Sequence, residues 1–154
     1  MPVVEEHVTI CADPQVTWDY LAEPAHSQVW DTVIDSAEQI EDGPIAKGIH
    51  WRGVARLLGR RIPWETEFVE CESPGRRVQR TTGGPMTFVL IITLEPVAEG
   101  TRMNYRIESE AGLGGVFGRI ADPFVARVSA RSLRASLQTL KGLIEGDSEP
   151  ARHP

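Results

Sequence analysis

The order of strand-like and helix-like segments constrains this chain most. Strand-like sequence fills residues 33–109, and one long helical stretch over about residues 122–144 then closes the chain. A long helix laid across a curved antiparallel sheet encloses space between the two. Small residues in the middle of this helix predict that the space is left partly empty. This order of segments therefore predicts a protein that encloses an apolar molecule in a cavity.

Length and composition indicate one globular domain. A chain of 154 residues can bury a core without disulfides or metals, and its 41% hydrophobic and 25% charged residues are ordinary for a soluble protein. The residues after position 146 are polar and contain proline. We expect a single domain over residues 1–146 and a flexible tail over residues 147–154.

Charge, hydropathy and cysteine usage argue against several partners. The net charge of -6 disfavours nucleic acid, because binding phosphates needs a basic surface. No apolar run reaches the roughly 20 residues of a membrane span, and the N-terminus lacks a signal-peptide pattern. Cys11 and Cys71 lack metal-ligand spacing, and we expect them to be buried thiols. We therefore expect a cytoplasmic monomer or homodimer with no metal and no cofactor.

The first 30 residues predict one strand and two short helices. Residues 3–11 alternate and are rich in β-branched side chains, which is typical of a strand. Asp13 followed by Pro14 predicts the start of one helix, and Glu23 followed by Pro24 the start of another. The expected buried face of the first helix consists of Val16, Tyr20 and Leu21, with Trp18 outside it.

Six further strand segments follow, separated by turn signals rich in glycine and proline. Gly59-Arg60 is a candidate for a tight hairpin turn. Because the connections are short, they favour an antiparallel meander over parallel crossovers. The expected strands cover residues 33–41, 48–58, 62–71, 77–82, 86–95 and 101–109.

Alternation along the strands assigns side chains to an inward and an outward face. Gly53 and Ala55 are small for inward positions. They either accommodate the packed helix or leave room for a ligand. We expect the inward side chains to line the ligand site: Trp51, Ala55, Trp64, Thr66, Phe68, Phe88, Leu90, Ile92, Met103, Tyr105 and Ile107.

The closing helix carries large apolar residues towards its end and small ones in its middle. At about 100° per residue, one stripe contains Leu133, Leu137, Leu140 and Ile144. Its backward extension adds Ala126, Ser129 and Ala130, which with Leu133 are expected to line the pocket.

Apolar residues on either side of Asp122-Pro123 lie nearly opposite this stripe. Aspartate at the N-cap and proline at the first helical position favour a helix start there, so we expect residues 112–121 to form a separate flap. The alternative is that both apolar faces are buried, one of them in a dimer contact.

Several turn and packing motifs carry a resemblance to a known family. They are the opening helix over residues 13–21, Glu23-Pro24 with Trp30, residues 72–77, and Leu94-Glu95-Pro96 with Gly100-Thr101-Arg102 and Tyr105. In these motifs the chain resembles the START-like superfamily, and within it the polyketide cyclase/dehydrase and lipid transport family. The resemblance implies an α+β helix-grip fold: a strand, two helices, six strands and a long helix gripped by a curved antiparallel sheet. It also implies a deep cavity between sheet and helix.

Three residues are candidates for chemistry, although no metal, phosphate-loop or nucleophile–base motif occurs. His26, expected between the two short helices, either acts on a polar ligand group or is a surface residue, and we favour the second. Tyr105 is a buried phenol that needs the ligand or the backbone as its partner. Arg80, if inward like Val78, needs a counter-charge such as a ligand carboxylate; a shifted register, which we favour, puts it in solvent.

We first expect binding, carrying or sensing of a hydrophobic small molecule such as a lipid, a polyketide or an aromatic metabolite. The alternative is an enzyme, a cyclase or dehydratase that folds a reactive chain in the same cavity. A third hypothesis is a protein-interaction module, ribosome-associated or toxin-like, that uses Phe124 and Val128 or the outward Val89 and Ile91.

Overall fold

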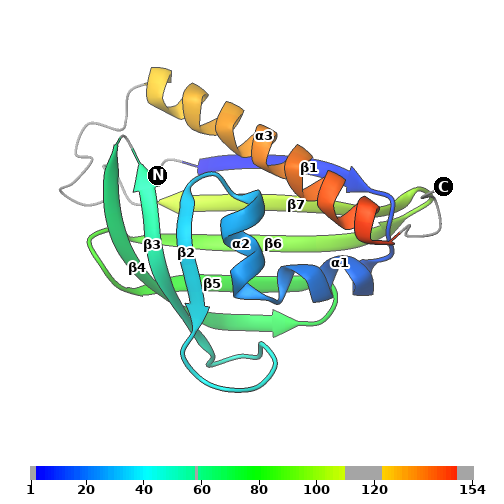
Figure 1. Ribbon diagram of the computed structural model, residues 1–154, viewed down its shortest axis with the longest axis horizontal. Coiled ribbons are helices and arrows are strands. Elements are labelled where there is room, and N and C mark those ends of the chain that lie inside the picture. The colour runs from blue at the N-terminus through cyan, green and yellow to red at the C-terminus, as the bar shows by residue number, and fades with distance from the viewer. Residues whose placement is uncertain (1–2, 58, 110–122, 149–154) are drawn as a thin grey trace.

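The computed structural model confirms the predicted order of one strand, two helices, six strands and a final helix (Figure 1). It describes residues 3–57, 59–109 and 123–148. The elements are β1 (Val3–Ile10), α1 (Pro14–Leu21), α2 (Pro24–Trp30), β2 (Ile34–Gln39), β3 (His50–Leu57), β4 (Arg60–Glu72), β5 (Arg76–Gly83), β6 (Phe88–Val97), β7 (Gly100–Ser109) and α3 (Pro123–Ser148).

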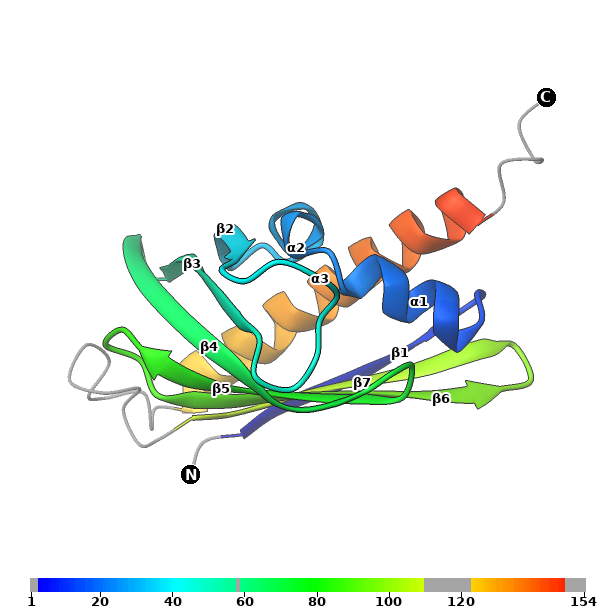
Figure 2. The ribbon, with the colours of Figure 1, turned by 90° about the horizontal axis from the view of Figure 1, so that it is seen from below.

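The seven strands form one antiparallel sheet in the order β1-β7-β6-β5-β4-β3-β2. The first two strands of the chain therefore lie at opposite edges, and α1 and α2 carry the chain from one edge to the other. Figure 2 shows that the sheet curls, so that β2 and β3 rise beside the helices. All three helices lie on the concave side, which matches the predicted helix-grip fold.

Close contact between β2, β3 and β4 explains the small residue at position 53. A Cβ atom on Gly53 would lie 1.9 Å from the carbonyl oxygen of Ser36 and 2.8 Å from the ring of Trp64. The sequence left open whether this position makes room for a helix or for a ligand. Neither is the case at Gly53, because the neighbouring strand and an indole ring take the space.

Helix α3 begins at Pro123, as predicted, and crosses β1 and β7 diagonally (Figure 1). Its leucine end packs as expected, since Leu137, Leu140 and Ile144 are buried. Arg134 pairs with Glu6 on β1 at 3.1 Å. The helix ends at Ser148, inside the segment predicted as a tail. The predicted flap over residues 112–121 lies outside the described residues.

The predicted buried face of α1 is wrong in part. Trp18 and Thr17 are buried together with Leu21, whereas Val16 is 41% exposed. At about 100° per residue, positions 17, 18 and 21 share one side of a helix. The indole of Trp18 offers the largest apolar surface of α1, and its burial sets which side faces the core.

Most buried apolar side chains of the described residues form two clusters. The first lies between the three helices and strands β1, β6 and β7, and the second lies on β2, β3 and β4 together with Met86. Ile45 packs against both clusters. Members of the first include Ile10, Trp18, Trp30, Ile92, Met103, Tyr105, Leu137 and Leu140; members of the second include Trp51, Ala55, Trp64 and Phe68.

Candidate ligand-binding site

Two rows of side chains cross the concave face of the sheet where the two clusters meet. Residues directly opposite one another on antiparallel strands point to the same face. Both rows therefore face the helices and place polar groups of β5 beside apolar groups of β6. One row consists of Arg77, Ile92 and Tyr105, and the next consists of Gln79, Leu90 and Ile107.

Arg77 is a buried cation at the centre of this face, with 3% of its surface exposed. Its Nη1 atom donates a hydrogen bond to the carbonyl oxygen of Leu21 at 2.8 Å. The guanidinium lies over two aromatic rings, 5.1 Å from the centroid of Trp51 and 5.6 Å from that of Phe68. Burial lowers the pKa of Arg77 to about 10.

Two buried polar atoms without partners belong to the inward residues of β5, and a third lies on β4. Among the described residues, Arg77 Nε, Gln79 Oε1 and Trp64 Nε1 are buried and have no hydrogen-bond partner. The other end of the Gln79 amide is satisfied, because Nε2 donates to Thr66 Oγ1 at 3.0 Å. Buried polar atoms are almost always paired, so these atoms are candidates for contact with a ligand or water.

Tyr105 and Asp31 add two titratable groups to the same interior. The ring of Tyr105 meets that of Trp30 edge-on at 6.1 Å. Burial raises the pKa of the Asp31 carboxyl to about 6, although Oδ1 accepts a hydrogen bond from the backbone of Val33 at 3.0 Å. Burial also raises the pKa of Tyr105, and the nearby Asp31 charge adds to that shift. The carboxyl group of Asp31 thus titrates around pH 6.

Three apolar side chains that pack against the first cluster are only half-buried. Leu90 and Ile107, at the ends of β6 and β7, are half-buried, as is Leu133 on α3. Further along the same strands, Ile92 and Met103 are completely buried. The side chains are therefore packed less tightly at this end of the sheet, where the sequence predicts the pocket.

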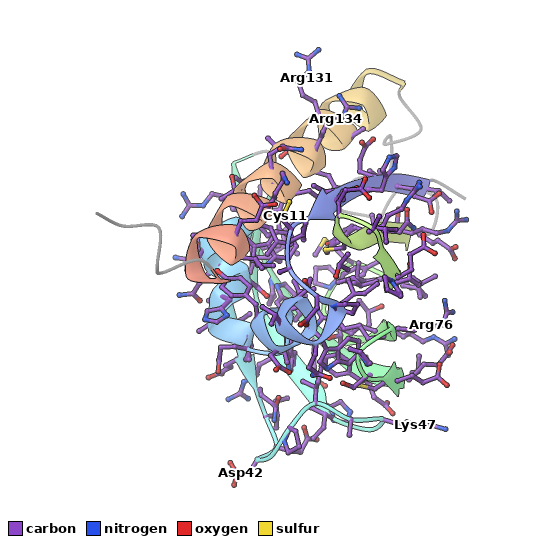
Figure 3. The ribbon with its side chains drawn as sticks, turned by 90° about the vertical axis from the view of Figure 1, so that its right-hand side faces the viewer. Cys11, Asp42, Lys47, Arg76, Arg131 and Arg134 are labelled. Carbon is purple, nitrogen blue, oxygen red and sulfur yellow. The ribbon has the colours of Figure 1, made fainter. Side chains whose placement is uncertain are left out.

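A separate groove of about 720 Å³ opens on the other side of the helix pair. It lies between the α1–α2 junction and the β2–β3 connection, whose tip carries Asp42 and Lys47 at the end of the molecule opposite Arg131 (Figure 3). Apolar lining residues include Trp18 and Ile45. Five carboxylates also line it: Asp19, Glu23, Glu38, Glu41 and Asp42. None of the predicted ligand residues contributes to this groove.

Most of the positions predicted to face inward are buried where the structure describes the side chains. Contact with a ligand stays a prediction for all of them. Ala126 and Ser129 belong to the part of α3 whose side chains lie outside the described residues. Buried members are Trp51, Ala55, Trp64, Thr66, Phe68, Ile92, Met103 and Tyr105, and half-buried ones are Phe88, Leu90, Ile107, Ala130 and Leu133.

His26 lies inside α2 rather than between the two helices. Its ring stacks on that of Tyr20 at 4.0 Å, and Nδ1 lies 2.8 Å from the carbonyl oxygen of Tyr20. These contacts support the structural interpretation of His26 over a role in binding the ligand.

Arg80 is exposed, in agreement with the shifted register. Val78 belongs to neither core cluster and shares the outer face with Arg80. Arg77 and Gln79 therefore take the inward positions of β5, and sequence reasoning missed both. The shifted register that we favour from the sequence holds on this strand, where two polar residues face inward and the buried Val78 lies on the opposite face.

Asp31 was also missed. The only signal was its place directly after Trp30, at the end of α2. In the described part of the chain, no group of three histidine, cysteine or acidic side chains is placed to hold a metal ion. Nor does any described helix combine the length and apolar character needed to cross a membrane.

A family model described as polyketide cyclase/dehydrase and lipid transport matches residues 1–145. The chain belongs to this family. Among solved structures, this member of the polyketide cyclase/dehydrase and lipid transport family is similar to TTHA0849 from Thermus thermophilus, with a TM-score of 0.78 at 20% identity over 96% of this chain and 99% of that one.

Two further structures share the fold of this family member. The ZhuI aromatase/cyclase from Streptomyces sp. R1128 has a TM-score of 0.74 at 17% identity, covering 99% of this chain and 98% of that one. A START superfamily protein from Mycobacterium smegmatis has a TM-score of 0.73 at 14% identity, covering 93% and 97%. No curated protein matches the sequence. At these identities the likeness shows the fold.

Proposed function

We propose that this protein binds, carries or senses a hydrophobic small molecule such as a lipid, a polyketide or an aromatic metabolite. The site lies between the concave sheet and α3. The observation that carries the proposal is the set of unpartnered buried polar atoms, Arg77 Nε and Gln79 Oε1 among them, beside apolar side chains that stay half-buried. Apolar burial supplies affinity at about 25 cal/mol per Å², and the polar atoms fix the orientation.

The family and the fold support this proposal. The family description includes lipid transport, and one structural neighbour is an aromatase/cyclase. Both activities require an apolar molecule to be enclosed by protein. The cytoplasmic location and the monomeric or homodimeric state expected from the sequence stay predictions.

Thermal-shift screening against lipids and aromatic metabolites, with native mass spectrometry of the purified protein, tests the proposal. A hydrophobic ligand should raise the melting temperature or co-purify. In Leu133→Trp the larger ring should fill the space beneath α3 and abolish the shift, whereas Gln138→Trp, at an exposed position of the same helix, should retain it. A wild-type protein that binds no member of either ligand class would contradict the proposal.

One observation favours a second candidate, a cyclase- or dehydratase-type enzyme acting in the same site. Asp31 has a pKa of about 6 and lies near Tyr105, so it can exchange a proton at neutral pH. Short polyketone thioesters are suitable probes, with loss of water followed by mass spectrometry. Turnover should disappear in Asp31→Asn and survive in Asp19→Asn, an exposed carboxylate of the outer groove. Equal turnover in the two variants would exclude this role for Asp31.

A further inference from the structure

The unpaired charge of Arg77 narrows the class of ligand. We propose that the ligand of the interior site is a hydrophobic acid whose anionic oxygen group, a carboxylate or an ionised enol or phenol, binds the Arg77 guanidinium. This inference rests on the proposed function and adds the chemistry of the ligand's polar end.

No described protein group neutralises Arg77. Its ionisable neighbours are Tyr105 and Cys71, and burial raises the pKa of each, so both are uncharged at neutral pH. Among the described residues, Arg77 makes no ion pair with a carboxylate, unlike the neighbouring Arg76, which pairs with Glu70 at 3.2 Å. A buried ionised group is normally paired, and an anionic ligand would supply the missing counter-charge.

Arg77 is also held in place for such an anion. The hydrogen bond to the Leu21 carbonyl uses one N–H at Nη1, and the rings of Trp51 and Phe68 support the guanidinium. Nε stays without a partner in the described part of the chain. A guanidinium supported in this way offers its remaining N–H groups to planar oxygen groups with little loss of side-chain freedom.

The apolar part of the ligand would bind next to Arg77, on the adjacent row of inward side chains. Gln79, Leu90 and Ile107 form the row next to that of Arg77, and the last two are half-buried. An acid bound at Arg77 would lay its apolar body along this row towards Leu133. A hydroxyl group on that body would satisfy Gln79 Oε1. The outer groove suits an acid poorly, because its charged lining residues are all carboxylates.

Matched pairs of probes test the inference by isothermal titration calorimetry. Dodecanoate is compared with dodecanol, and 2-naphthoate with 2-acetylnaphthalene, so the two pairs separate aliphatic from aromatic acids. Wild-type protein should bind at least one acid about tenfold or more tightly than its neutral partner. The preference should disappear in Arg77→Met and persist in Arg80→Met, an exposed arginine of the same strand.

The outcomes separate this inference from the proposed function. Equal affinity of wild type for acids and neutral partners would overturn the inference and leave the proposed function standing. Absence of binding by all four probes would overturn both. If circular dichroism shows that Arg77→Met is unfolded, Arg77→Lys keeps the charge without the planar donor pair. It should then retain only part of the acid preference, and full retention would count against the role assigned to the guanidinium.

Discussion

Arg77 on β5 and Leu21 at the end of α1 lie 56 residues apart in sequence and are joined by a hydrogen bond of 2.8 Å from Nη1 to the carbonyl oxygen. The bond connects the centre of the sheet to the helix pair that crosses its concave face. It also satisfies a carbonyl at a helix end. The same guanidinium thus has a structural contact at one nitrogen and an unused donor at another.

Arg77→Met should raise the free energy of unfolding of the ligand-free protein by about 1 kcal/mol. Burial that lowers the pKa from 12.5 to about 10 corresponds to a cost of about 3 kcal/mol for the charged form. Loss of the hydrogen bond to Leu21 and of the contacts with the rings of Trp51 and Phe68 offsets this gain by about 2 kcal/mol. Urea denaturation measures the difference, with Arg80→Met as the control that should change little. A decrease of more than about 2 kcal/mol would show that the cation serves the fold rather than a ligand.

Asp31→Asn should change how stability depends on pH. The folded-state pKa of about 6 lies above the ordinary 3.8, so the protonated form is favoured on folding. The resulting stability is complete below about pH 4 and is lost as the pH rises through about 6. Relative to wild type, the variant should therefore gain about 3 kcal/mol between about pH 4 and pH 7. Thermal or urea unfolding across this range checks the prediction, and parallel curves would contradict it.

Glu41→Gln should lower the pKa of His50. Nδ1 of His50 lies 2.6 Å from Glu41 Oε2, and this hydrogen bond is the main reason why the pKa of His50 is raised above 6.5. Glu67 and Glu65 on β4 add to the shift. The stabilising contact is complete below about pH 6.5 and is lost as the pH rises through the folded-state value. NMR titration of the His50 ring measures the pKa, and an unchanged value in the variant would show that the contact is absent in solution.

Gly53→Ala should destabilise the protein by more than about 2 kcal/mol, because the new Cβ would overlap the backbone of Ser36 and the ring of Trp64. Gly142 provides the matched control. It lies in α3, and a Cβ atom added there would have no described neighbour within 4 Å, so Gly142→Ala should stabilise the helix by about 1 kcal/mol. Equal effects in chemical denaturation would contradict the close packing of β2, β3 and β4.

The fold was predictable because its signals are local. Asp13-Pro14 begins α1, the glycine and proline turns separate the strands, and Pro123 begins α3. The inward rows of β6 and β7 followed from plain alternation, which holds where one face is apolar and the other polar.

The polar centre of the site was not predictable in this way. On β5 the inward residues are Arg77 and Gln79, while Val78 is buried on the opposite face and belongs to neither core cluster, so placing the apolar residue inward assigns the wrong face. Asp31 becomes a site residue only because α2 ends over Tyr105, a contact between distant parts of the sequence. No local sequence pattern predicts the inward position of Arg77 and Gln79 or the position of Asp31 near Tyr105.

The most direct test is a crystal structure with a bromonaphthoate, because anomalous scattering locates the bromine independently of the protein density. We expect the carboxylate within hydrogen-bond distance of Arg77 Nε and the bromine between α3 and the β6–β7 strands, near Leu90 and Ile107. Bromine found only in the outer groove beside Trp18, with Arg77 still unpaired, would contradict this expectation.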